Sequence, residues 1–109
     1  MIINDRFDKF GNMLPTKIGD ISFSPNDGFS IDDAIVITGA KGSYDGVDGE
    51  YKYLSQRFGE KNKDWSLKMQ VLLEKDGKAF DQMQIISVRE QTEFSIYFEI
   101  TEFFGNDII

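Results

Sequence analysis

The Asp76-Gly77 turn, set between two strand-like segments, constrains the fold more than any other feature of the chain. Asp-Gly is among the strongest short-range signatures of a β-hairpin. Before the turn, residues 65–73 alternate between apolar and mostly polar side chains, and residues 94–100 alternate in the same way. A period of two is typical of half-buried strands. The pattern predicts an antiparallel three-stranded meander over residues 65–101.

Two registers fit the first hairpin of this meander. A two-residue loop places Gln84 opposite Met69 on the core face, whereas a three-residue loop with Gly77 in the left-handed conformation pairs Met69 with Met83. We expect the three-residue loop, because it pairs apolar residues with each other on the core face.

In the expected register the other face of the meander is also apolar. It carries Leu72 beside Phe80, with Ile86 further along. A large apolar face is either covered by the rest of the chain or used for association. We therefore expect residues 1–40 or a partner to cover it, and self-association into a homodimer through Leu72, Phe80 and Ile86 is one hypothesis.

An amphipathic helix precedes the meander. Its apolar stripe follows helical spacing at Val47, Tyr51, Leu54 and Phe58. Asp45 is a candidate N-cap and Gly59 suits the left-handed position after the last turn. Gly49 inside this run costs about 1 kcal/mol relative to alanine. We expect the helix over residues 46–58.

The remaining segments complete the predicted architecture. Residues 34–38 are a short, β-branched apolar run that indicates a buried strand, and residues 17–23 indicate a weaker one. Residues 1–16 are expected to form a loosely structured arm. The sequence predicts one α+β domain over residues 1–109, in the order β-β-α-β-β-β, with an antiparallel sheet and one main helix packed on one face.

Histidine and cysteine are both absent from the 109 residues. The commonest general base and the commonest transition-metal ligand are therefore missing. Disulfides, thiolate zinc sites and cysteine nucleophiles are excluded as well. A close pair among the 19 Asp and Glu residues is inevitable, so such a pair alone does not indicate a glycosidase. We expect no catalytic activity, no cofactor and no metal site.

Acidic residues dominate the charge. The 19 Asp and Glu outnumber the 12 Lys and Arg, which gives a formal net charge of −7. This charge opposes binding to nucleic acid. The sequence shows no signal peptide and no apolar run of about 20 residues. It predicts a cytoplasmic protein without membrane contact.

Two local motifs resemble ligand-binding loops but differ from them in spacing. The glycine spacing matches neither the dinucleotide fingerprint nor the P-loop. Residues 45–50 are rich in carboxylates, yet Tyr44 and Ser55 would occupy the first and last ligand positions of an EF-hand. An irregular carboxylate-based calcium site that includes Asp32 and Asp33 is kept as an alternative.

The charge is also unevenly distributed along the chain. Residues 20–50 hold seven carboxylates and one lysine, whereas residues 52–78 hold seven bases and four acids. An acidic surface attracts a basic protein and speeds its association at low salt. We therefore expect a small non-catalytic binding protein that engages or neutralises a basic partner, as an inhibitor or immunity protein does with a toxin. The residues expected at this interface are Asp32, Asp33, Tyr44, Asp45, Asp48 and Glu50, with Tyr44 as an aromatic anchor.

Overall fold

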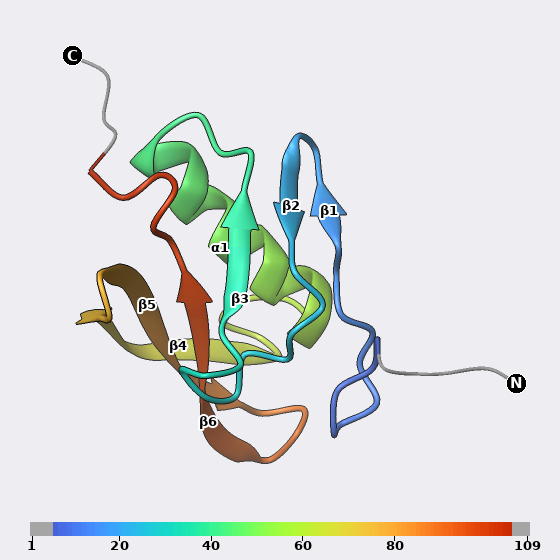
Figure 1. The fold of residues 1–109 in the computed structure, drawn as a ribbon. Helices are drawn as coiled ribbons and strands as arrows, with labels where there is room; N and C mark the ends of the chain where they lie inside the picture. Colours follow the sequence, from blue (N-terminus) through green and yellow to red (C-terminus); the bar gives the residue numbers. More distant parts are fainter. Residues whose placement is uncertain (1–5, 106–109) are drawn as a thin grey trace, which may run out of the picture.

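The computed structural model of the chain describes residues 6–105. One helix and six strands follow one another (Figure 1). The strands form a single sheet in the order β1-β2-β3-β6-β5-β4. The elements are β1 (Lys17–Ile18), β2 (Ile21–Phe23), β3 (Ile35–Thr38), α1 (Ser43–Phe58), β4 (Trp65–Lys75), β5 (Lys78–Ser87) and β6 (Thr92–Glu99).

The predicted α+β class and the C-terminal meander are confirmed. β4, β5 and β6 pair antiparallel in sequence order. β3 runs parallel to β6, so the sheet is mixed and mostly antiparallel. The single strand expected over residues 17–23 is divided into β1 and β2 by a tight turn at Gly19-Asp20.

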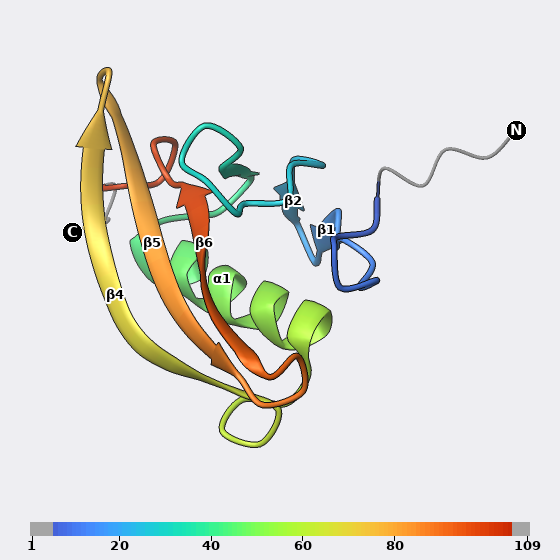
Figure 2. The same ribbon diagram turned by 90° about the horizontal axis from the view of Figure 1, so that it is seen from below.

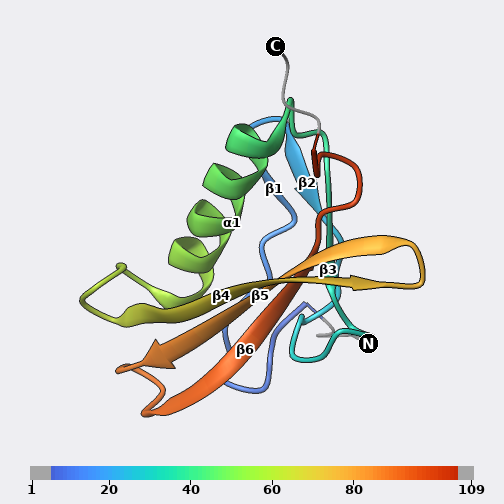
Figure 3. The same cartoon turned by 90° about the vertical axis from the view of Figure 1, so that its left-hand side faces the viewer.

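The helix α1 lies against one face of the sheet, inside the curve that β4, β5 and β6 describe (Figure 2, Figure 3). The core fills the space between them. Met83 of β5 pairs with Ile96 of β6, and both side chains are fully buried. The rings of Tyr53 on α1 and Phe98 on β6 meet edge to face, with their centroids 5.4 Å apart. Aromatic and aliphatic burial therefore holds the helix on the sheet.

The helix begins at Ser43, three residues before the expected start. The predicted N-cap is wrong: Gly42 occupies that position, and no side chain caps it. Asp45 lies in the first turn instead, where its Oδ2 accepts a hydrogen bond from the backbone N–H of Lys41 at 2.9 Å. A carboxylate in the first turn still complements the positive end of the helix dipole.

Two glycines inside α1 permit close packing. A Cβ atom at Gly46 would overlap the ring of Phe103, which is 2% exposed. A Cβ atom at Gly49 would lie 2.9 Å from the terminal methyl group of Ile21 on β2. The helix therefore contains residues of low helical propensity because larger side chains would not fit beneath it.

Gly46→Ala is expected to destabilise the fold by about 1–2 kcal/mol, although alanine favours a helix, because overpacking against a buried ring outweighs the gain in propensity. Gly49→Ala is the matched control, since it meets only a flexible methyl group and should cost less. Urea unfolding of both variants measures the difference. Equal stabilities, or no recovery when Phe103→Leu is added to Gly46→Ala, would contradict the packing argument.

The predicted register of the β4–β5 hairpin is wrong. Asp76 and Gly77 both have positive φ, at 55° and 77°, and Lys75 pairs with Lys78, so the loop has two residues. Met69 therefore lies opposite Gln84. Gln84 does not enter the core, because this register places both Gln84 and Met69 on the outer face of the sheet.

A β-bulge between Leu67 and Met69 restores the expected pairing further along β4. Leu67 lies opposite Ile85, as the three-residue loop had predicted for that pair. The extra residue at the bulge, Lys68, shifts the strand by one position. The sequence pattern did not reveal this insertion, because apolar residues occupy every second position on both sides of it. Only the face of the sheet to which those positions point is reversed.

The hypothesis of a shared face for Leu72, Phe80 and Ile86 is also wrong. Leu72 lies opposite Asp81, and Phe80 is the neighbour of Asp81 on the same strand. Because successive side chains alternate between faces, Leu72 lies on the helix side of the sheet, whereas Phe80 and Ile86 lie on the outer side.

The N-terminal arm is anchored from residue 6 onward, and residues 1–5 of the expected arm lie outside the described residues. Asp8 is buried, and its Oδ1 accepts backbone hydrogen bonds from Phe10 and Asn12, both at 2.9 Å. Its Oδ2 accepts a hydrogen bond from Nε of Arg57 at 2.9 Å, in an ion pair with no exposed side-chain surface on either partner. Leu14, 2% exposed, adds apolar contact.

Arg57→Met is expected to lower the free energy of unfolding by about 3–5 kcal/mol, because it leaves the Asp8 carboxylate buried without its cation. The double variant Asp8→Asn/Arg57→Met should recover part of that loss, since it removes the unpaired charge and keeps Oδ1 as the acceptor for Phe10 and Asn12. Denaturant unfolding of the two single variants and the double variant measures this coupling. If the loss of unfolding free energy in the double variant equals the sum of the losses in the two single variants, the pair does not act as a unit.

Candidate functional site

Three of the predicted contact residues lie together at the start of α1. Tyr44 is 86% exposed. Asp48 is exposed and forms an ion pair with Lys52 one turn later, with 2.9 Å between Nζ and Oδ2. Asp45 and Asp48 line a pocket of about 180 Å³ together with Asp20, Lys41 and Lys52, so charges of both signs are present here. We call Asp20, Tyr44, Asp45 and Asp48 the α1 N-terminal surface.

A second exposed aromatic side chain lies at the same end of the helix. Phe103 packs under Gly46, and its carbonyl oxygen accepts a hydrogen bond from the Ser43 hydroxyl at 3.2 Å. The next residue, Phe104, is 44% exposed. The ring of Phe104 thus remains accessible next to Phe103, which packs on the first turns of α1.

Glu50 does not belong to this surface. Its side chain is fully buried on the sheet side of α1. The sequence placed it among exposed acids because its neighbours are acidic, but the helical turn carries position 50 about 120° around the axis from Tyr44, onto the buried face. The prediction that Glu50 contacts a partner is wrong for this reason.

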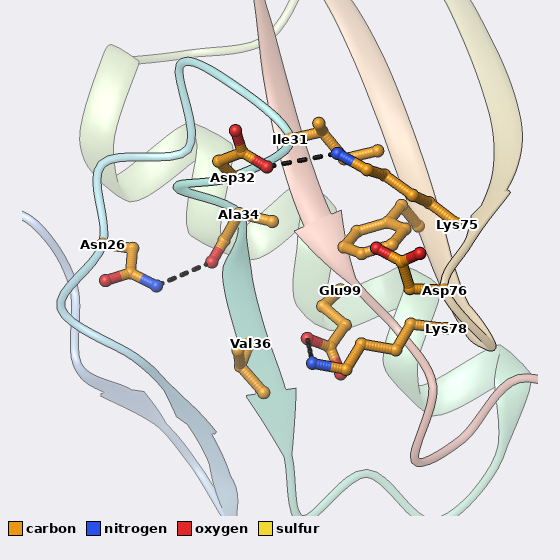
Figure 4. A pocket seen from close by; sticks show the side chains of 10 residues that line it. Asn26, Ile31, Asp32, Ala34, Val36, Lys75, Asp76, Lys78 and Glu99 are labelled. Carbon is orange, nitrogen blue, oxygen red and sulfur yellow. Dashed lines mark hydrogen bonds and ion pairs between the residues drawn. The ribbon is translucent and has the colours of Figure 1, made fainter.

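Asp32 and Asp33 form a separate acidic location. Both are exposed and lie in the loop that leads into β3, whereas the α1 N-terminal surface follows the other end of that strand (Figure 1). Asp32 forms an ion pair with Lys75 at the β4–β5 hairpin, with 3.2 Å between Oδ1 and Nζ (Figure 4). The six predicted contact residues therefore do not form one continuous patch.

A pocket of about 320 Å³ lies under this ion pair, between the loop, β3 and the hairpin (Figure 4). Phe80 lines it and is 6% exposed, so it is unavailable to a second copy of the chain. Lys78 and Glu99 approach each other across the opening at 3.9 Å. Charges of both signs line the pocket, so its electrostatics favour neither an anion nor a cation.

Glu50 and Asp81 form a buried acid pair between α1 and β5. Their exposures are 0% and 5%. Burial, followed by the hydrogen bond and the negative charge of Asp81, raises the pKa of Glu50 to about 10. Both carboxylate oxygens of Glu50 lack a hydrogen-bond donor as long as the group is ionised. Protonation supplies that donor, so Glu50 is neutral at pH 7 and donates to Asp81.

Two neighbouring carboxyl groups, one of them with a raised pKa, also occur in the active sites of glycosidases. The location of this pair is different from that of an active site. The pair is sealed between helix and sheet, and a sugar could not reach either group without unfolding the contact. We therefore interpret the pair as a structural feature whose effect is on stability.

Glu50→Gln is expected to raise the free energy of unfolding at pH 7 by up to about 3 kcal/mol. In the wild type, unfolding returns the Glu50 pKa to 4.5 and releases the proton that the folded chain holds, which favours the unfolded chain at pH 7. Between pH 4.5 and about 10 the folded chain holds the extra proton, so wild-type stability falls as pH rises. The variant should lack this slope. Unfolding measured across that range tests it.

Asp48→Asn provides the control for this slope. It removes an exposed carboxylate from the same helix and should leave the pH dependence between pH 4.5 and about 10 almost unchanged. An identical slope in Glu50→Gln and the wild type would contradict the assignment of the titrating group to Glu50.

The calcium alternative requires several oxygen ligands close together. Among residues 6–105, no three Asp or Glu side chains come close enough together to hold a metal ion. Asp32 and Asp33 lie at one end of β3 and the carboxylates of the first turns of α1 follow the other end.

Among residues 6–105, no helix is long and apolar enough to span a membrane.

No pattern noted in the sequence singled out Arg57, whose buried side chain donates three hydrogen bonds in the structure. A signal was present in its spacing, because Glu50, Tyr53 and Arg57 recur at i, i+3 and i+7 and share one helix face. Two ionisable residues on a stripe with a tyrosine indicate a face that needs partners.

Comparisons with known protein families, with curated proteins and with solved structures each yield no match.

Proposed function

We propose that this chain is a small non-catalytic binding protein that engages a basic protein through the α1 N-terminal surface, in the manner of an inhibitor or immunity protein acting on a toxin. One observation carries the proposal: Tyr44, at 86%, is the most exposed large hydrophobic side chain among residues 6–105. It is the neighbour of Asp45 in the first turn of α1 and lies one turn before Asp48.

Tyrosine suits such a role because it offers a large rigid ring and a polar tip at low conformational cost. Interface hot spots are enriched in aromatic residues set among complementary charges. Tyr44 has no packing role in the fold, since its ring is almost fully in solvent. Its presence at this position is therefore better explained by contact with another molecule than by folding.

The neighbouring charges are available to a partner. Asp48 is engaged only by Lys52, and both side chains are more than half exposed. Exposed ion pairs contribute little to stability, so an arginine or lysine of a partner can replace Lys52 at small cost. The net charge of −7 adds long-range attraction for a basic protein.

The test begins with the partner captured from the native cell on immobilised wild-type chain, followed by binding kinetics with the purified partner. Tyr44→Ala should weaken affinity by about 2 kcal/mol, mainly through faster dissociation. Asp48→Lys should lower the association rate about tenfold at low salt, and less at high salt.

Asp32→Lys is the matched control, because it makes the same change of charge at an exposed carboxylate near the other end of β3. It should alter the association rate less than Asp48→Lys. Equal effects of the two charge reversals, or unchanged affinity of Tyr44→Ala, would show that binding does not use the α1 N-terminal surface.

A further inference from the structure

The strand β4 forms one edge of the sheet and, among residues 6–105, pairs with no strand on the side away from β5. Figure 2 shows it as the outermost strand of the curved sheet. Only its first residue is covered, since the carbonyl oxygen of Trp65 accepts a hydrogen bond from the N–H of Asn62 at 2.5 Å. The edge from residue 66 to residue 75 presents unpaired backbone groups to solvent.

This edge lacks the usual protection over its central part. Natural proteins guard exposed edges with charged residues, proline, bulges or very short strands. Residues 69–73 contain no charged residue, proline or glycine. Met69 and Leu72 are 50% and 49% exposed, and they lie on opposite faces of the strand. The bulge at Lys68 lies at one end of this segment only.

We propose that the edge of β4 pairs antiparallel with β4 of a second copy of the chain, about a two-fold axis at Val71. Such an axis makes the interface self-complementary, so each residue meets the position equally far on the other side of Val71. Gln70 then lies opposite Leu72 of the second copy, and Met69 opposite Leu73. The exposed apolar side chains become buried on both faces of the extended sheet.

The hydrogen-bonding pattern of β4 agrees with this register. The two-residue turn makes Lys75 and Lys78 the bonded pair nearest the loop, so Lys75, Leu73 and Val71 direct their backbone groups toward β5. The alternate residues Gln70 and Leu72 direct theirs to the free edge. With the axis at Val71, Gln70 of each copy meets Leu72 of the other in bonded pairs.

The apolar side chains on the outer face of the segment support a second copy as the occupant. Met69 and Leu73 are equally distant from Val71, so apolar side chains of one copy meet apolar side chains of the other on that face. Lys68 takes no part in this symmetric contact, because its Nζ forms an ion pair with Oε1 of Glu93 on β6 at 3.1 Å. A strand from an unrelated protein would not in general carry this symmetry.

Residues 70 and 72 provide the test, because both are exposed. Leu72 lies opposite the buried Asp81, so the variants need the folding control given below. Gln70→Lys/Leu72→Lys and Gln70→Glu/Leu72→Glu each place like charges opposite one another across the axis. Either variant should raise the dimer dissociation constant about tenfold or more. An equimolar mixture of the two should associate again, because each lysine then meets a glutamate.

Sedimentation velocity measures the mass of each sample up to about 1 mM chain, so that weak association is also seen. We expect a dimer for the wild type, monomers for each like-charge variant and dimers for their mixture. Gln70→Glu/Leu72→Lys, whose charges are opposite across the axis, should dimerise and shows that a charged edge still folds. Tyr44→Ala should leave the dimer unchanged.

A monomeric wild type would overturn the proposal. So would like-charge variants that dimerise as strongly as the wild type, or a mixture that stays monomeric. None of these results bears on the α1 N-terminal surface, because that surface lies on other residues and is tested by Tyr44→Ala.

Discussion

The rest of the structure depends on the hydrogen bonds and the ion pair made by the buried Arg57 guanidinium. Its Nε donates to Asp8 of the N-terminal arm, and its Nη1 donates to the carbonyl oxygen of Asp27 and to the hydroxyl of Tyr53. The rings of Phe29 and Phe58 lie 5.1 Å and 4.8 Å from its Cζ and add cation–π attraction. One side chain thus joins the arm, the loop before β3 and the helix, although its buried Nη2 has no hydrogen-bond partner among the described residues.

The same helix face buries a second ionisable residue in the opposite way. Glu50 lies two turns before Arg57 and, among residues 6–105, has no ion pair with a cation, so the helix accommodates it as a neutral acid that donates to Asp81. Arg57 cannot lose its charge and must therefore be paired, whereas a carboxyl group can be protonated. Both residues, with Gly46 and Gly49, share the buried face with Leu54 and Phe58, whereas Val47 and Tyr51 of the expected stripe are only half-buried.

The two surfaces that remain open are physically different. The α1 N-terminal surface offers an isolated ring among charges, which suits a partner attracted over a distance. The edge of β4 offers backbone hydrogen bonds and apolar side chains, which suit a strand of matching register. The structure keeps them on separate elements, α1 and β4, so the chain has room to use one without obstructing the other.

The sequence by itself determined the α+β class, the meander and the approximate place of the helix, because hydrophobic period and turn chemistry are local properties. Tertiary structure alone decided the rest. The bulge at Lys68 reversed the phase of β4 without changing its alternation, and Glu50 moved from a presumed surface into the core. The partner of Arg57 is 49 residues away along the chain, and no local pattern encodes which distant carboxylate will meet a buried cation.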